Sequence, residues 1–172
     1  MVPIGAVDIT FILLSVYVSN QTNQTLYVAS AMMSLGAVGT LLMALIPVPK
    51  YKLIGQYLGL ASVSSYVLML ASIANNVSGY TKKIFYNGMM MIFYTVGNFL
   101  GPFVMAPRFA PHYVQGLVIY FCAMEIAALL LLFARWKMAI VNKERLAQPS
   151  DVATNVEDDL TDVQDPNFIY RL

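Results

Sequence analysis

Residues 113–134 read YVQGLVIYFCAMEIAALLLLFA, and this stretch decides the fold class of the chain. Its 22 residues include a single charged side chain, Glu125. A helix rises about 1.5 Å per residue, so this length crosses the roughly 30 Å hydrocarbon core of a bilayer. Because lipid offers no hydrogen-bond partner to the backbone, the stretch is predicted to be a membrane-spanning helix.

Four more apolar runs precede this one, at about residues 4–18, 26–46, 53–74 and 84–105. The first is short for a membrane span, whereas the other three have the required length of about 20 residues. Short polar or proline-containing links separate the runs, so neighbouring helices should be antiparallel. The sequence therefore predicts an all-α membrane protein with about five transmembrane helices, packed in residues 1–134 as a partial bundle.

The composition agrees with a lipid-embedded chain. Of the 172 residues, 59% are hydrophobic and 11% are charged, whereas soluble domains carry about 25% charged residues. The net charge of +1 offers no basic surface for nucleic acid, so the expected partner is the lipid bilayer. The chain has one cysteine, Cys122, and one histidine, His112. We therefore predict no metal site, no cofactor and no enzymatic triad.

Residues 135–172 change character from basic to acidic. We expect a juxtamembrane helix followed by a mostly disordered terminus. Lysine and arginine concentrate on the cytoplasmic side of membrane proteins. Because successive helices cross the membrane in opposite directions, seven of these residues fall on the same side as the tail and three on the opposite side. The seven are Lys82, Lys83, Arg135, Lys137, Lys143, Arg145 and Arg171, and the three are Lys50, Lys52 and Arg108. A cytoplasmic C-terminus is therefore predicted.

Two carboxylates lie within the apolar runs, Asp8 in the first and Glu125 in the last. A charge near the bilayer centre costs roughly 2.5–3.5 kcal/mol on insertion scales, so each needs a reason to be there. One interpretation is that they bind the coupling proton of a transport cycle. The other is that each is hydrogen-bonded to a neighbouring helix or lies in a hydrated gap.

The third and fourth predicted helices each carry small and polar residues at helical spacing. Ser72 and Asn76 end one such stripe, and Tyr94 and Asn98 lie on the other. The stripes could line a water-filled path, which makes these four residues candidate substrate ligands. Close helix packing is the alternative, as the spacing of Gly55 with Gly59 and of Gly97 with Gly101 indicates.

Two further features bear on gating. Pro102 follows Gly101 and is expected to kink or loosen the fourth helix. Lys82 and Lys83 follow the third helix, where they either set the topology by their charge or act as a gate or latch between helices.

Several short segments resemble the fungal allantoate permease family, the anion:cation symporter branch of the major facilitator superfamily. They are NVSGYTKK at 76–83, GNFLGP at 97–102, APHY at 110–113, DDLTD at 158–162 and NFIY at 167–170. The sequence departs from the family pattern at Phe103, where glutamine is usual, and this change removes a polar group near the substrate path.

This resemblance implies that the chain corresponds to helices eight to twelve of a twelve-helix transporter whose N-terminal half it lacks. It also implies proton-coupled uptake of small organic anions, such as allantoate, ureides or carboxylate vitamins, at the plasma membrane. Alternating access requires two bundles that rock about a central site. The alternative is therefore a non-transporting truncated or accessory membrane protein.

Overall fold

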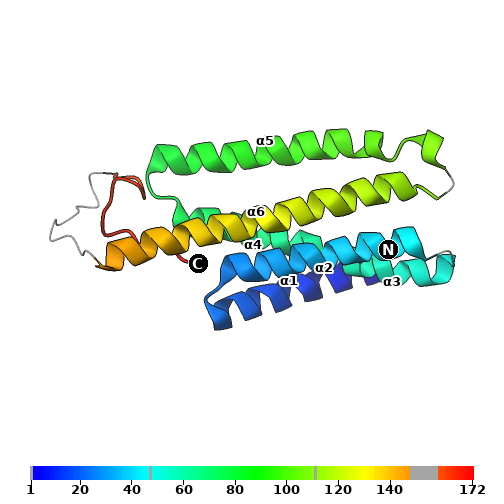
Figure 1. Ribbon diagram of the computed structural model, residues 1–172, viewed down its shortest axis with the longest axis horizontal. Coiled ribbons are helices and arrows are strands. Elements are labelled where there is room, and N and C mark those ends of the chain that lie inside the picture. The colour runs from blue at the N-terminus through cyan, green and yellow to red at the C-terminus, as the bar shows by residue number, and fades with distance from the viewer. Residues whose placement is uncertain (1, 47, 111, 148–158) are drawn as a thin grey trace.

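The computed structural model describes residues 2–46, 48–110, 112–147 and 159–172. In chain order its elements are α1 (Val2–Thr22), α2 (Thr25–Leu45), α3 (Pro49–Gly59), α4 (Ala61–Asn76), α5 (Tyr80–Val104), the 3₁₀ turn η1 (Pro107–Phe109) and α6 (Val114–Ala147). No strand occurs in these ranges, so the predicted all-α class is confirmed. Figure 1 shows the helices side by side along one axis.

Four stretches of the described chain are long and apolar enough to cross a membrane: Ile4–Thr22, Thr25–Leu45, Lys50–Asn76 and Val114–Ala147. The helix α5 has 25 residues but is not one of the four, because polar and small residues interrupt its apolar ones. That α5 also spans the membrane stays a prediction.

The bundle has two ends that differ in the links they carry (Figure 1). The end where α1, α4 and α6 finish, and where α2 and α5 begin, is called the tail end below, because residues 159–172 lie there. The opposite end, with the α2–α3 link and the loop before α6, is called the far end.

The predicted helix 53–74 is broken in two at Leu60. The Leu60 N–H bonds to the Tyr57 carbonyl (3.3 Å), and the Val63 N–H bonds to the Leu60 carbonyl (3.0 Å). This three-residue spacing is that of a 3₁₀ turn, which tightens the backbone locally. The Ser62 hydroxyl donates to the Gly59 carbonyl (2.8 Å), so a side chain helps to satisfy the backbone at the break.

The helix α2 is the centre of packing. It contacts α6 most extensively, then α4 and α3. Around it a small core forms from Leu26, Val28, Ala29, Leu68 and Leu131. Polar groups add to this contact, since the buried Ser30 hydroxyl donates to the Ala128 carbonyl of α6 (3.1 Å).

Glycines let α2 approach α3 and α4 backbone to backbone. A Cβ on Gly39 would lie 2.5 Å from the Gly59 nitrogen and 2.6 Å from the Gly55 carbonyl oxygen. A Cβ on Gly36 would lie 2.9 Å from the Ser62 Cβ. The expected packing role is therefore seen for Gly55, whose own Cβ would lie 2.7 Å from the Gly39 carbonyl oxygen, but not for Gly59, where a Cβ would meet nothing within 4 Å. Gly36 and Gly39 are the partners that the sequence reading had missed.

The helix α5 is the outlier of the bundle. None of its residues, all of which lie in the described ranges, is buried. A Cβ on Gly97 would meet nothing within 4 Å, so the packing expected for the Gly97 and Gly101 pair is absent at Gly97. Within the part of the chain that the structure describes, α5 packs against α4 over a short stretch only.

The last helix continues beyond residue 134, as expected of a juxtamembrane helix, whereas the tail differs from the expectation. At 34 residues and about 1.5 Å per residue, α6 is longer than a bilayer core and extends past residue 134 to Ala147. Residues 159–172 then fold back against the tail end, where they form a series of hydrogen bonds. The prediction of a mostly disordered terminus is wrong for these residues, because their backbone polar groups find side-chain partners on the helices. Residues 148–158 lie outside the described ranges.

Candidate functional site

The predicted substrate ligands fall into two separate groups. Ser72 and Asn76 lie one turn apart at the tail end of α4, both buried, and the Asn76 Nδ2 donates to the Ser72 Oγ (3.1 Å). The Asn76 side chain also accepts from the Arg171 N–H (2.7 Å) and donates to the Arg171 carbonyl (2.9 Å). The hydrogen-bonding groups of this amide are therefore occupied by the chain itself.

The other two candidates lie on the exposed surface of α5. The ring of Tyr94 is tilted against the ring of Tyr66 of α4, with centroids 5.0 Å apart, and Asn98 lies one turn further along. A phenol hydroxyl and an amide are suitable donors for a carboxylate ligand. The structure thus keeps Tyr94 and Asn98 accessible and does not bring them together with Ser72 and Asn76.

The two intramembrane carboxylates have different surroundings. Glu125 is half-buried between α6 and α2, and its Oε2 accepts from the Ser34 hydroxyl (3.3 Å). This is the hydrogen bond to a neighbouring helix that one interpretation expected. The Oδ1 of Asp8 is shielded from solvent and has no hydrogen-bond donor among the described residues. Of the two, Asp8 is therefore the carboxylate with a shielded oxygen that lacks a donor among the described residues.

The predicted gating residues also separate. Lys82 is half-buried, and its Nζ lies 2.6 Å from the Asp162 Oδ1 in an ion pair. Lys83 is exposed. Near the other end of α5, the Tyr120 hydroxyl of α6 donates to the Gly101 carbonyl (2.9 Å), one of the last four carbonyls, which have no partner within the helix. Pro102 lies inside α5, and its missing N–H leaves the Asn98 carbonyl without its helical donor.

Asp162 is the centre of a polar cluster at the tail end. It is 5% exposed, although it lies ten residues before the last residue of the sequence. Its Oδ2 accepts from the Tyr170 hydroxyl (2.8 Å), and its Oδ1 accepts from the Ser78 N–H (3.4 Å) as well as from Lys82. Arg145 of α6 donates to the Asp162 carbonyl (2.7 Å).

Charges and hydrogen bonds set the ionisation of this cluster. Burial alone raises the pKa of Asp162, but the hydrogen bonds from Lys82 and Tyr170 and the Lys82 charge outweigh it, so the pKa lies below its ordinary value of 3.8. Burial, together with the hydrogen bond to Asp162 and its charge, raises the pKa of the Tyr170 phenol above 10.0. At neutral pH Asp162 is therefore a carboxylate and Tyr170 a neutral phenol.

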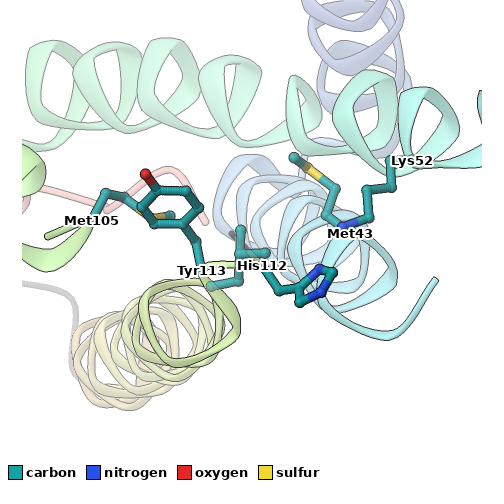
Figure 2. A pocket seen from close by; sticks show the side chains of 6 residues that line it. Met43, Lys52, Met105, His112 and Tyr113 are labelled. Atoms are coloured by element: carbon teal, nitrogen blue, oxygen red, sulfur yellow. The ribbon is translucent and has the colours of Figure 1, made fainter. Parts of the chain in front are cut away.

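A pocket of about 480 Å³ opens at the far end, lined by Met43, Lys52, Met105, His112, Tyr113 and Leu117. Figure 2 shows the Lys52 amine and the His112 ring reaching toward the same opening from two different segments. Two basic side chains above thioether and leucine walls form a surface that suits a small organic anion. No group of three potential metal ligands occurs in the described ranges.

The sequence reading missed three residues of the tail end: Asp162, Tyr170 and Asn142, whose side-chain amide is hydrogen-bonded to the Tyr170 backbone. Asp162, Tyr170 and Asn142 lay in segments interpreted as juxtamembrane or disordered. A signal was present, since Asn142 is an amide on a helix that leaves the membrane, and aromatic residues interrupt the acidic tail at Phe168 and Tyr170. Neither feature shows which helix the tail contacts.

Comparison with curated proteins finds relatives among fungal transporters. An uncharacterized transporter of Schizosaccharomyces pombe is 28% identical over 179 residues, which cover 98% of this chain and 34% of the relative. The allantoate permease of Saccharomyces cerevisiae is 28% identical over 130 residues, 72% of this chain and 24% of the relative. A thiamine pathway transporter of the same yeast is 25% identical over 174 residues, 98% of this chain and 33% of the relative.

The chain is similar to fungal transporters over nearly all of its length. It spans about a third of the length of the first of these relatives. No family model matches the sequence, and no solved structure matches it either.

Proposed function

We propose that this chain is the C-terminal part of a proton-coupled transporter of small organic anions, such as allantoate, ureides or carboxylate vitamins. The observation that carries the proposal is the similarity, over 98% of the chain, to a protein named as a transporter, together with four stretches able to span a membrane. The name of the allantoate permease supports an organic anion as the substrate.

In this proposal the chain supplies helices eight to twelve of a twelve-helix major facilitator transporter, and the N-terminal half completes the substrate cavity. Tyr94 and Asn98 are the proposed substrate ligands on α5, because both are exposed and carry donors for a carboxylate. Asp8 is the proposed proton carrier, since its Oδ1 is shielded and lacks a donor among the described residues. Glu125 is the second choice, because Ser34 already holds it.

The proposed location is the plasma membrane, with the tail end of the bundle in the cytoplasm. The count of seven basic residues near the tail end against three near the far end supports this orientation. The far-end pocket with Lys52 and His112 would then open to the outside, where it could concentrate anions before they enter the cavity.

Uptake measurements test the proposal. The complete gene is expressed in yeast cells that lack their own uptake, and radiolabelled allantoate is supplied at acidic and at neutral external pH. Faster uptake at acidic pH is expected, and Asp8→Asn should abolish this difference while Ser34→Ala, the control at the Glu125 contact, should keep it. Asn98→Ala should raise KM with little change in the maximal rate.

Absence of uptake for every organic anion, from a protein that reaches the plasma membrane, would contradict the proposal. The chain would then be a non-transporting membrane protein that associates with other carriers. Co-purification of the tagged chain with a second carrier would support this alternative.

A further inference from the structure

Residues 159–172 form a C-terminal strap across the tail end of the bundle. In Figure 1 this segment, in red, runs from beside the start of α5 back toward the ends of the other helices. Its last residues bond alternately to opposite helices, as an extended chain does. Tyr170 exchanges two hydrogen bonds with the Asn142 amide of α6 (both 2.8 Å), and Arg171 exchanges two with the Asn76 amide of α4. The Leu172 carbonyl accepts from the Thr25 N–H of α2 (2.7 Å).

The start of the strap holds the start of α5. The Asp159 carboxylate accepts from the Tyr80 N–H (2.9 Å), one of the N–H groups of the first turn that have no partner within the helix. Ser78, in the link before α5, donates its hydroxyl to the Leu160 carbonyl (2.9 Å). The ion pair of Lys82 with Asp162 follows on the first turn of the helix.

A chance fold-back of the tail would not bury a charge. Moving a carboxylate out of water is costly unless it is paired and hydrogen-bonded, and Asp162 has both kinds of partner. Ser78 and Lys82 flank the start of α5, and Tyr170 belongs to the strap itself, yet all three meet the same carboxylate. The tail end therefore provides a built binding site for this segment.

The strap matters for α5 because little else holds that helix. With no buried residue, α5 contacts α4 through the Tyr94 and Tyr66 rings, and it is otherwise fixed by Tyr120 and the Gly116–Met105 contact at its far end and by the strap at its tail end. We propose that Asp162 and Lys82 form a latch through which the C-terminal strap positions α5, so that release of the latch frees the tail end of α5 to move.

This inference rests on the proposed function and deepens it, because α5 carries Tyr94 and Asn98, the substrate ligands named in that proposal. It assigns Lys82 and Asn76 as positioning residues: Lys82 acts on α5 through Asp162, and Asn76 acts through Arg171. The sequence predicted that Asn76 binds substrate. Substrate binding and positioning of the strap lead to different expected results for Asn76 variants.

The first experiment measures the strap itself, without transport. Hydrogen exchange is followed in the full chain reconstituted in nanodiscs, for the wild type and for Lys82→Met, Lys82→Arg and Lys83→Met. The Lys82→Met variant should accelerate exchange in residues 159–172 and at the start of α5 by about tenfold, the factor that corresponds to the loss of a hydrogen bond to a charged group. Lys83→Met removes the same charge from an exposed neighbour and should leave exchange unchanged, and Lys82→Arg should restore protection.

The second experiment separates positioning from substrate binding in the complete transporter. Asn76→Ala and Asn142→Ala should lower the maximal uptake rate to a similar extent and leave KM unchanged, because both remove an anchor of the strap. If Asn76 binds substrate instead, Asn76→Ala alone raises KM, and the Asn142 variant behaves like the wild type.

The outcomes distinguish this inference from the proposed function. If no variant transports but Lys82→Met alone loosens the strap, the proposed function fails and the latch stands. If Lys82→Met and Lys83→Met change exchange equally, or neither does, the latch is overturned, and the two lysines act only as topology-setting charges.

Discussion

The helices α2 and α5 have similar lengths, 21 and 25 residues, but the bundle holds them in different ways. The helix α2 is fixed along its length, by a buried apolar face and by glycines that meet the backbones of α3 and α4. The helix α5 has no buried residue; apart from the ring contact of Tyr94 with Tyr66, polar contacts at its two ends hold it. Packing thus makes one helix a rigid centre, whereas the other depends on hydrogen bonds that can be exchanged.

The largest expected effect tests the glycine crossing of α2. In Gly39→Val the new Cβ would lie 2.5 Å from a backbone nitrogen, so α2 and α3 must separate, and we expect most of the chain to be lost as misfolded protein. Size-exclusion chromatography of fluorescently tagged chains measures the folded fraction.

Gly97→Val on α5 is the matched control, because a Cβ there meets nothing within 4 Å. It should give the wild-type elution profile. Equal damage from the two variants would contradict the contrast between the helices.

A smaller loss of stability is expected when leucine side chains are replaced by alanine. Leu68 of α4 is 3% exposed and packs in the core beside α2, so Leu68→Ala should cost about 2–3 kcal/mol of unfolding free energy. Leu100 of α5 is 52% exposed, and Leu100→Ala should cost less than about 1 kcal/mol. Denaturant titration in mixed micelles compares the two, and a reversed order would place α5 in the core.

The third prediction concerns pH at the tail end. The pKa of Asp162 is lowered in the folded chain, so its contribution to docking the strap is complete above the ordinary value of 3.8 and is lost as the pH falls through the lowered value. The pKa of Tyr170 is raised, so its contribution is complete below 10.0 and is lost as the pH rises through the raised value.

A spin label at Val163, which is 70% exposed on the strap, reports this docking in a Cys122→Ser background. The groups that face Asp162 are Lys82, Tyr170 and the Ser78 N–H, with Arg145 on its carbonyl. The label should be immobile at neutral pH and mobile both below the lowered pKa of Asp162 and above the raised pKa of Tyr170. In Asp162→Asn the acid transition should disappear, and its persistence would assign it to another carboxylate.

The smallest effect is expected from Gly88→Ala on α5. A Cβ at this position meets nothing within 4 Å, and alanine is favoured over glycine inside a helix by about 0.5–1 kcal/mol. The variant should unfold at a slightly higher denaturant concentration. A loss of stability would mean that another element packs on this face of α5.

The sequence predicts the parts of this fold that depend on local pattern. Apolar length and lipid's lack of hydrogen-bond partners are sufficient to predict the helices, and the spacing of Gly55 with Gly59 predicts a close crossing. The break at Leu60 was not predicted, because the glycine before it, Gly59, was interpreted as a packing residue and not as a helix stop. Its cause is a local 3₁₀ turn.

The candidate site was harder to predict, because its contacts join residues far apart in the chain. The latch joins residues 80 positions apart, and the Asn76–Arg171 pair joins residues 95 positions apart. Composition identifies the tail as acidic and polar, which is typical of disordered segments, but it does not show that Asn76, Asn142 and Lys82 form a matching surface. Lys82 and Lys83 look equivalent in sequence, and only the structure separates them.

The central claim is that the strap holds the tail end of α5 through polar contacts, whereas α2 is held by packing along its length. Double electron–electron resonance tests this most directly, with spin-label pairs at the exposed Val38 of α2 and Phe93 of α5, and at Val38 and Leu129 of α6, in a Cys122→Ser background. In the chain reconstituted in nanodiscs both distance distributions should be narrow, and Lys82→Met should broaden the α2–α5 distribution while the α2–α6 distribution stays narrow. An α2–α5 distribution that Lys82→Met leaves unchanged would contradict the account.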